Sequence, residues 1–566
     1  MITATSTQDR FVVSGACLAM FLCYLIGTTE VYTYADDSLP FAHQVHTRPV
    51  IIVHHLILFL LYHLNHALGY TVEHDFARTI NLFKLYVAAT AAMALALVGV
   101  LALRWFGSLK KALVAMFVVG FSYGFWSYAI VTDVYVPAVS FVLLAMYFAD
   151  KSYEAPKRVR GWTLLFLAGV SVLCAALNHQ SHSLAVIPMA LVLWLGRREE
   201  LPWRLRLARS FSFFAITGVL GFVAYYGSYR LSHENVDFIT YVRGYSAWMK
   251  MMPYDKLQLL TPLYMLVGIG RAFLFPEYAL YFDSVYDRLH QHFSLKLLSD
   301  DRYVVREMPD AYIVFLLVVI GVLSVAAVWF VVRAILTLWR TPPPAPCFWM
   351  LLLWIPIQSI LFAWWEATSN EMWIWMLPCV GLIGACLVVS DERTCRGRVL
   401  LGLFLTAWVI VNGSVVSRYW SKNNCIYRIN KDYLNQLTDQ DLAITAYLAP
   451  SSEFEFLLDH RPPMIHFRDG AFSFEDTALR QDLARVERND GRVYLDPILV
   501  MPDDTEINLL LYQAQARRDD VVKELLKLEA YCKETGIPLY GVRRRGGDVI
   551  RFIPCPFQGY LQWVEQ

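Results

Sequence analysis

The sequence predicts a mostly α-helical protein that crosses a membrane many times and ends in an extracytoplasmic α/β domain. Of its 566 residues, 57% are hydrophobic and only 17% are charged, which is typical of polytopic membrane proteins. Apolar runs of about 18–25 residues recur along the first three quarters of the chain, and each is long enough to cross a bilayer. From about residue 421 onward, short strand-like and helix-like segments replace these runs.

The first element is an apolar run near the N-terminus that follows a single arginine. It lacks a small-residue cleavage site, so we expect a retained span and not a removed signal peptide. Further runs of the same kind bring the expected number of transmembrane helices to about eleven. They cover approximately residues 11–28, 80–103, 112–131, 135–149, 162–177, 183–196, 211–229, 311–334, 348–365, 371–390 and 399–417.

Basic residues are distributed unevenly between the loops that connect these runs. The short loops around residues 133, 178–182 and 366–370 contain no lysine or arginine. By the positive-inside rule, the basic loops and the N-terminus are cytoplasmic and the C-terminal domain lies outside an inner (cytoplasmic) membrane. The basic residues of the predicted cytoplasmic loops are Arg104, Lys110, Lys111, Lys151, Lys157, Arg158, Arg160, Arg197, Arg198, Arg204, Arg206, Arg209, Arg340, Arg393, Arg396 and Arg398.

Two apolar stretches are expected not to cross the membrane. Residues 50–68 carry several histidines and an asparagine, which suit an interfacial helix better than a lipid-exposed span. Counting this stretch as a span would also move the first group of basic residues to the outside. Residues 259–275 are interrupted by Pro262 and Gly268, which favours a re-entrant or interfacial helix. The membrane domain, residues 1–420, then has external loops at 29–79 and 230–310.

The C-terminal region, residues 421–566, is predicted to form a small α/β domain. Gly546 and Gly547 indicate a hairpin turn between its last two strands. The expected strands are 441–447, 492–500, 537–543 and 548–553, and the expected helices are about 475–488 and 506–535.

Charge and cysteine content exclude several classes of function. The net charge is +1, so no nucleic-acid partner is expected. The ten cysteines include no CxxC pair and no zinc-type spacing, so neither a disulfide framework nor a structural zinc is indicated.

Polar side chains gather on the predicted outer side of the membrane. Asp36 and Asp37 lie just where the chain leaves the first span, and either carboxylate could act as a general base toward an acceptor hydroxyl. The guanidinium of Arg48 could hold a phosphate by bidentate hydrogen bonds. The catalytic residues expected are therefore Asp36 and Asp37, and those expected to bind substrates are Arg48, His46, His54, His55, Asp133, His179 and Glu366.

Structural roles remain open for each of these residues. Asp36 and Asp37 could cap an interfacial helix, and Arg48 could pair with lipid headgroups. Asp133 could be a solvated loop carboxylate, and His179 could be a hydrogen-bonded structural histidine. Trp373 and Trp375, in the last of the polar loops, are typical of an interfacial aromatic belt. The grouped histidines and carboxylates also permit a metal site, although no HExxH-type spacing supports one.

Several short motifs resemble the GT-C class of integral-membrane glycosyltransferases. An acidic pair in the first external loop, Asp36-Asp37, is followed by His46-Thr-Arg-Pro49, where aminoarabinose-transferase relatives have Lys-Pro-Pro; Val50 departs from that pattern. Residues 77–83, Ala-Arg-Thr-Ile-Asn-Leu-Phe, resemble the start of the second span in this class. Two further segments, 125–135 and 177–182, are similar to elements of a bacterial subfamily related to protein O-mannosyltransferases. The resemblance covers roughly residues 10–200, and beyond that it rests on architecture alone.

The resemblance implies a polyprenyl-phosphate-linked sugar donor, inversion at the anomeric carbon and a carboxylate base. It also implies that Arg48 contacts the phosphate and that Asp133 faces the external cavity. The expected partners are this donor, membrane lipid and an extracytoplasmic acceptor that is a lipid, a glycan or a protein. Some GT-C enzymes require a divalent cation such as Mg or Mn and others do not, so the cofactor stays open.

Two other classes of function compete with this one. A flippase or transporter usually shows inverted repeats and broken helices at mid-membrane, and the sequence shows no such internal symmetry. A non-catalytic envelope-assembly protein would use the external domain to bind a partner. The single Asn-x-Ser sequon, at Asn412, falls within a predicted span, which favours a bacterial or archaeal cytoplasmic membrane over the endoplasmic reticulum.

Overall fold

The computed structural model describes most of the membrane domain and the core of the C-terminal region. It divides into two compact units, which are described separately. One unit comprises Met1–Thr71, Arg78–Pro276 and Val314–Ser421, and the other comprises Val72–Ala77, Glu277–Ile313 and Lys422–Gln566. The described residues are 7–27, 38–47, 55–154, 158–195, 201–232, 237–241, 259–292, 305, 308–340, 348–365, 367–388, 395–416, 434–445, 456, 458, 463–466, 474, 476–495, 518–545 and 549–554.

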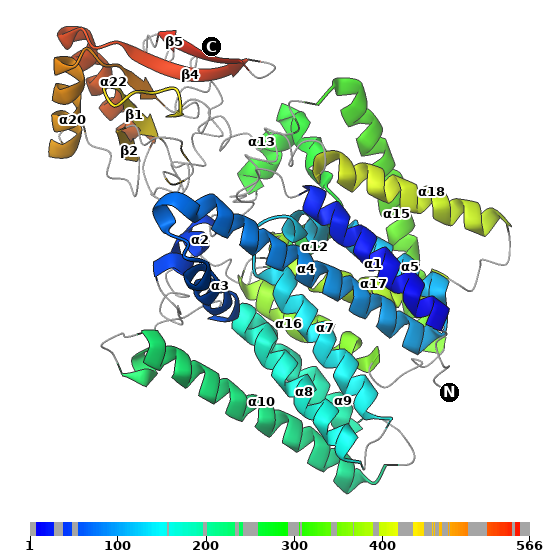
Figure 1. The fold of residues 1–566 in the computed structure, drawn as a ribbon. Coiled ribbons are helices and arrows are strands. Elements are labelled where there is room, and N and C mark those ends of the chain that lie inside the picture. The colour runs from blue at the N-terminus through cyan, green and yellow to red at the C-terminus, as the bar shows by residue number, and fades with distance from the viewer. Residues whose placement is uncertain are drawn as a thin grey trace. The chain divides into compact units, whose positions relative to one another are not determined.

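The first unit is a bundle of α-helices (Figure 1). Helices occupy every segment predicted to be a span, with short 3-10 helices (η) at two of the breaks. The elements are α1 (Thr7–Gly27), α2 (Ser38–Thr47), α3 (His55–Leu68), α4 (Val72–Phe106), α5 (Leu109–Gly120), α6 (Tyr123–Ala129), α7 (Tyr135–Ser152), α8 (Val159–Asn178), η1 (Gln180–Ala185), α9 (Val186–Leu195), α10 (Trp203–Ser232), α12 (Thr261–Phe273), α15 (Asp310–Arg340), α16 (Phe348–Trp365), η3 (Glu371–Trp373), α17 (Met376–Val388) and α18 (Cys395–Gly413).

Seven of the described helices are long and apolar enough to span a membrane, and an eighth span results if the bent pair α5–α6 counts as one. The protein is therefore a multi-pass helical membrane protein. Helices α9 and α17, with 10 and 13 residues, would each reach only about 15–20 Å, less than the thickness of a hydrocarbon core. A 3-10 helix, η1 or η3, precedes each of them and takes up part of the predicted span. The third predicted span that does not qualify is α7, which ends in Asp150, Lys151 and Ser152.

Two short helices agree with the prediction that their segments do not cross. Helix α3 has 14 residues and α12 has 13, so each is too short to span a bilayer alone. His63 and His66 lie on the exposed side of α3, as expected for an interfacial helix.

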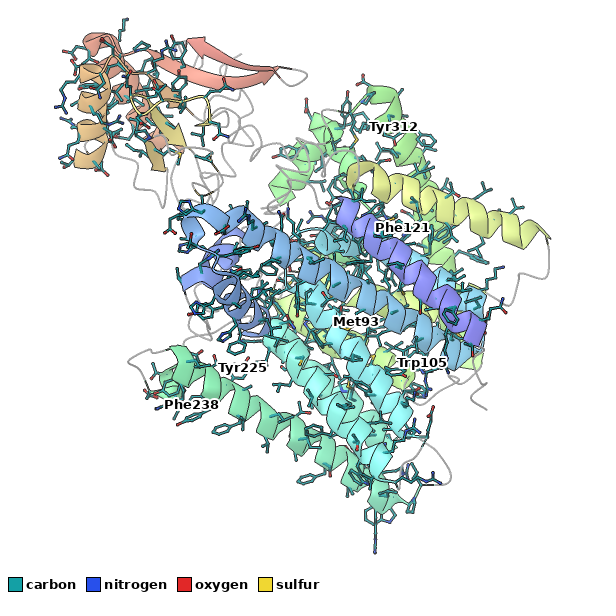
Figure 2. All side chains as sticks on the ribbon, in the orientation of Figure 1. Met93, Trp105, Phe121, Tyr225, Phe238 and Tyr312 are labelled. Carbon is teal, nitrogen blue, oxygen red and sulfur yellow. The ribbon has the colours of Figure 1, made fainter. Side chains whose placement is uncertain are left out.

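The bundle has a basic end at which α4 and α7 finish. Arg104, near the end of α4, pairs with Asp150 at 2.7 Å and with Glu154 at 2.8 Å. Helix α4 ends at Gly107, whose φ of 62° allows the chain to reverse and whose N–H donates to Leu103 O. Trp105 packs against Phe348 of α16 with ring centroids 5.8 Å apart (Figure 2).

The opposite end of the bundle is where α8 finishes and α7 begins. Tyr86 of α4 donates from its hydroxyl to Asn178 Oδ1, at the last residue of α8, over 3.2 Å. Tyr86 and Arg104 are 18 positions apart on one helix, which corresponds to about 27 Å along its axis. The polar and basic ends are therefore separated by about the thickness of a hydrocarbon core.

The second unit contains a five-stranded sheet with the order β2-β1-β3-β4-β5. Neighbouring strands are parallel from β2 through β4, and β5 is antiparallel to β4. All four predicted strands are present, and β2 was not predicted. The described β1 and β3 lie within their predicted ranges, whereas β4 and β5 are shifted toward the C-terminus by two residues and by one. The elements are β1 (Leu442–Thr445), β2 (Met464–His466), β3 (Val493–Leu495), β4 (Leu539–Arg545), β5 (Val549–Pro554), α20 (Thr477–Arg488) and α22 (Arg518–Thr535), with η2 (Pro276–Tyr281) and α13 (Asp283–His292) on the loop before α15. Gly546 and Gly547, the predicted hairpin turn, lie outside the described residues.

Helices α20 and α22 share one core with one face of this sheet. Alternate strand residues such as Leu442, Ile444 and Val493 point into it, and they pack against Leu483 of α20 and Leu528 of α22. The carboxylate of Asp476 accepts the N–H of Ala478 at 2.8 Å and so begins α20. Burial in this core also raises the pKa of the Cys532 thiol to about 12, which makes it a structural and unreactive thiol.

Candidate functional site

The structure describes three of the predicted site side chains, those of His46, Asp133 and His179. The predicted residues Asp36, Asp37, Arg48, His54 and Glu366 lie outside the described residues, and of His55 only the backbone at the start of α3 is described. Their roles remain predictions.

Asp133 lies in the short turn between α6 and α7 and is 5% exposed. One of its carboxylate oxygens accepts the N–H of Tyr135 at 2.9 Å and also the N–H of Val134. The carboxylate thus binds free N–H groups at the positive end of α7, where a negative charge is stabilised. It is not the solvated loop carboxylate that was considered as an alternative.

His179 follows α8 and belongs to a buried chain of polar side chains. Its Nδ1 lies 2.6 Å from the hydroxyl oxygen of Ser181, which also lies 3.2 Å from Nδ1 of His182. A hydroxyl has one proton to donate, so it can donate to one ring and must accept from the other. The His179 ring also lies 4.5 Å from the ring of Tyr135, which brings the two predicted residues Asp133 and His179 to the same place.

Glu371 and Tyr128 join this cluster from two further elements. The hydroxyl of Tyr128, in α6, donates to Oε2 of Glu371, in η3, over 3.1 Å. The hydroxyl of Tyr135 lies 3.9 Å from the sulfur of Met372, the next residue of η3. The site thus draws together α6, α7, α8–η1 and η3, and we refer to Tyr128, Asp133, Tyr135, His179 and Glu371 as the polar cluster. Glu371 was not among the predicted site residues, although its position at a basic-free span boundary was a usable signal.

The turn that carries Glu371 is supported by α12. Arg271 is 3% exposed, and its Nη1 donates to the carbonyl of Thr368 at 3.1 Å. Trp373 donates from its indole N–H to the carbonyl of Ala367 at 2.8 Å. Gly268 of α12 faces the same carbonyl, and a Cβ there would lie only 2.3 Å from it. These contacts define the turn from Ala367 to Trp373, which we call the Glu371 turn.

The two tryptophans of this region are not in an aromatic belt. Trp373 is 0% exposed and Trp375 is 1% exposed, and the rings of Trp354 and Trp375 lie 5.1 Å apart. They pack inside the protein, so the prediction that they line the membrane interface was wrong. Sequence alone could not distinguish the two cases because a tryptophan at a span end suits both.

His46 belongs to a second polar group, made by α2, α3 and α4. Its Nε2 lies 2.8 Å from the hydroxyl of Thr79, which also donates to Oδ1 of Asn65 over 3.2 Å. Thr79 and Tyr86 are two helical turns apart on the same face of α4, about 10 Å along its axis. The two polar groups therefore follow one face of α4 near the same end of the bundle.

The cluster offers hydrogen-bonding groups suited to a hydroxyl-rich ligand. It combines two carboxylates, an imidazole and two phenols, which can accept protons from hydroxyls and donate to them. Lys84, Arg209 and Arg271 are buried cationic side chains of the same unit, at 2%, 0% and 3% exposure. Within the described part of the chain, no group of three His, Cys, Asp or Glu side chains is arranged to hold a metal ion.

No model of a known protein family matches the sequence, and no curated protein matches it significantly. Among solved structures, the oligosaccharyltransferase of Archaeoglobus fulgidus in its apo form matches 90% of this chain and 69% of its own, with 10% identity and a TM-score of 0.49. ArnT from Cupriavidus metallidurans bound to undecaprenyl phosphate matches 81% of this chain and 86% of its own, with 11% identity and a TM-score of 0.45. The Pmt1-Pmt2 protein O-mannosyltransferase complex of S. cerevisiae, bound to the sugar donor, matches 41% of this chain and only 34% of its own, with 16% identity and a TM-score of 0.34. Similarity at this level assigns no substrate and no residue role; the chain is similar in structure to the GT-C glycosyltransferases that its motifs resemble.

Proposed function

We propose that the protein is a membrane glycosyltransferase that moves a sugar from a polyprenyl-phosphate carrier to an acceptor outside the cytoplasm. The observation that carries this proposal is the polar cluster, which four separate elements assemble at the end of the bundle opposite the basic residues. Polar groups inside a membrane protein are costly, so their convergence indicates a site that binds a polar ligand. The motifs resembling the GT-C class supply the kind of chemistry.

The sidedness of the proposed reaction follows from charge. Arg104 belongs to the basic end, which the positive-inside rule assigns to the cytoplasm. The polar cluster then faces outward, where a flipped lipid-linked sugar and an external acceptor can meet. The C-terminal α/β domain, predicted to be extracytoplasmic, would help to bind the acceptor.

In the proposed reaction, a carboxylate of Asp36 or Asp37 removes the proton of the acceptor hydroxyl. The acceptor oxygen attacks the anomeric carbon, the bond to the carrier phosphate breaks, and the phosphate leaves with the electron pair. Arg48 would stabilise the charge on the departing phosphate. The polar cluster, with His179 and Glu371, would orient sugar or acceptor hydroxyls. A divalent cation, Mg or Mn, would serve the same phosphate if the enzyme uses one.

The test is transfer by the purified full chain from polyprenyl phosphates carrying labelled sugars. Replacement of Asp36 and Asp37 by asparagine, singly and together, should abolish transfer because the amide cannot accept the proton. Monodisperse elution in detergent and an unchanged melting temperature would show that the variants fold. Wild-type rates in both single variants would remove the assignment of the base. Lipid movement across proteoliposomes without sugar transfer would instead favour a flippase.

A further inference from the structure

A buried asparagine in α18 lies far from the polar cluster in sequence but connects to it through two helix ends. Asn412 is 0% exposed, and its side-chain nitrogen donates to the carbonyl of Phe121 at 2.8 Å and to the carbonyl of Phe273 at 3.0 Å. An asparagine inside a membrane-spanning helix is costly unless its amide is hydrogen-bonded. These two bonds use both of the protons that the amide nitrogen can donate.

The two carbonyls belong to the ends of two different helices. Phe121, labelled in Figure 2, follows α5 at the break between α5 and α6. The two helices are bent by 71° at this break. Phe273 is the last residue of α12. The final carbonyls of a helix have no partner within it, and in a buried position they need one from elsewhere. Asn412 supplies that partner to both helices at once.

Helix α12, and helix α6 that continues the chain after α5, both contact the Glu371 turn. Helix α6, which begins after the break, carries Tyr128 and its bond to Glu371. Helix α12 carries Arg271 and its bond to the carbonyl of Thr368. The two helices also touch, since a Cβ at Gly124 of α6 would lie 3.1 Å from the carbonyl of Ala272.

Two side chains of the turn are buried without a hydrogen-bond partner. Ser369 and Asn370 are both 0% exposed, and neither the Ser369 hydroxyl nor the Asn370 amide has a partner within the structure as described. A sealed but unpaired amide and hydroxyl favour an opened turn, in which water would satisfy them. The bonds from α6 and α12 to the turn oppose this opening, in addition to the bond within the turn from Trp373 to Ala367.

From these contacts we infer that Asn412 is a positioning residue: its amide clamps the ends of α5 and α12 and so keeps the Glu371 turn closed against Tyr128. The clamp itself is independent of the chemistry, whereas its importance for turnover rests on the proposed function. Without the amide, two partly buried carbonyls lose their donor, which weakens the link between the ends of α5 and α12. Glu371 then loses its fixed place relative to the rest of the cluster.

A reporter thiol at position 369 tests the clamp directly in the full-length protein. Ser369→Cys is nearly isosteric and breaks no hydrogen bond, and the thiol is sealed while the turn is closed. Its rate of alkylation by a maleimide, read from the mass of the peptide that contains it, measures opening of the turn. In this background, Asn412→Leu and the isosteric Asn412→Asp should each raise the rate at least about tenfold. Thr406→Val is the control: it removes a polar group from an exposed position on the same helix, α18, and should leave the rate unchanged.

Sugar transfer in the Ser369→Cys background supplies the second reading. Each Asn412 variant should lower kcat at least about tenfold while the KM for the donor changes much less, since misplacement acts on the reacting geometry. Unchanged alkylation in both Asn412 variants would overturn the clamp. Increased alkylation with an unchanged kcat would overturn the positioning role of Asn412. If Asn412→Leu does not fold, Asn412→Asp decides. Absence of transfer by the wild-type protein would refute the proposed function, while the alkylation rates would still decide the clamp.

Discussion

Tyr135 is the residue around which the candidate site is organised. Its backbone N–H binds the carboxylate of Asp133, its ring packs on His179, and its hydroxyl reaches Met372 beside Glu371. A tyrosine at the first turn of a helix can make all three contacts because its backbone, ring and hydroxyl point to different neighbours. The site therefore depends on aromatic residues for its arrangement as much as on carboxylates for its chemistry.

The bond between Tyr128 and Glu371 predicts a specific loss of activity at the residue scale. Glu371→Gln should reduce kcat/KM for sugar transfer at least about tenfold, since a hydrogen bond to a charged group contributes about 1.5–3 kcal/mol. The protein should still fold, because the amide oxygen can accept the same hydroxyl. The measurement is steady-state transfer with a polyprenyl-phosphate sugar.

Tyr147 provides a control for the tyrosine half of that bond. It lies on α7 at the basic end, where its hydroxyl accepts from Lys151 at 3.1 Å. Tyr128→Phe should slow transfer, whereas Tyr147→Phe should not. Wild-type transfer rates for Tyr128→Phe and for Glu371→Gln would show that the reaction does not depend on this bond.

Short and interrupted helices form the site at the scale of elements. The breaks between α5 and α6, between α8 and α9, and between α16 and α17 turn polar backbone and side chains toward one another. In a continuous transmembrane helix, the same polar residues would be spread along the length of the helix instead of gathering at one place. Chain interruptions at a membrane protein's ligand site are tolerated when neighbouring side chains satisfy the freed backbone groups, as Arg271 and Asn412 do here.

Close packing of α12 on the Glu371 turn gives a prediction with a matched control on the same helix. A Cβ at Gly268 would lie 2.3 Å from the carbonyl of Ala367 and 2.4 Å from the indole nitrogen of Trp373, while a Cβ at Gly270 would meet nothing within 4 Å. Gly268→Val should therefore displace the turn, destabilise the protein by about 1–3 kcal/mol and reduce transfer. Gly270→Ala should leave both unchanged. Thermal unfolding and transfer rates measure the two effects, and equal behaviour of the two variants would refute this packing.

Hydrophobic length and polar interruptions are what made the elements predictable. The apolar runs located a helix in each expected segment. The histidine-rich stretch 50–68, predicted not to cross, contains α3, a described helix of 14 residues. Hydropathy could not show that α9 and α17 begin only after a 3-10 helix, because a long window averages that turn into the apolar run. Strand β2 escaped prediction because its three residues, Met464–His466, are too few to show an alternating pattern.

The site could be predicted only in part because some of its residues meet partners that are far away in the sequence. Asp133 and His179 were selected from short motifs, and the structure brings them together. Tyr86 has no distinguishing feature in the sequence, and Glu371 is distinguished only by its position at a span boundary without lysine or arginine. Their significance comes from partners 92 and 243 residues away, Asn178 and Tyr128. No local pattern encodes such a pairing.

At the scale of the whole molecule, the arrangement of charge is the main organising feature. Arg104, Asp150 and Glu154 form an ion-pair group at one end of the helical unit, and the polar cluster occupies the other. Lysine and arginine near span ends set orientation during insertion. In the proposed orientation, the polar cluster therefore lies at the end of the helical unit nearer the external acceptor.

Thiol accessibility in spheroplasts tests this arrangement most directly. His66 is exposed on α3 at the polar end, and Arg160 is exposed on α8 at the basic end, so His66→Cys and Arg160→Cys each place a reporter thiol in the full chain. A membrane-impermeant maleimide should label the His66→Cys variant at position 66 in intact spheroplasts. It should label the Arg160→Cys variant at position 160 only after the membrane is opened. The reverse pattern in intact spheroplasts, with position 160 labelled and position 66 protected, would put the polar cluster on the cytoplasmic side and contradict the proposed glycosyltransferase.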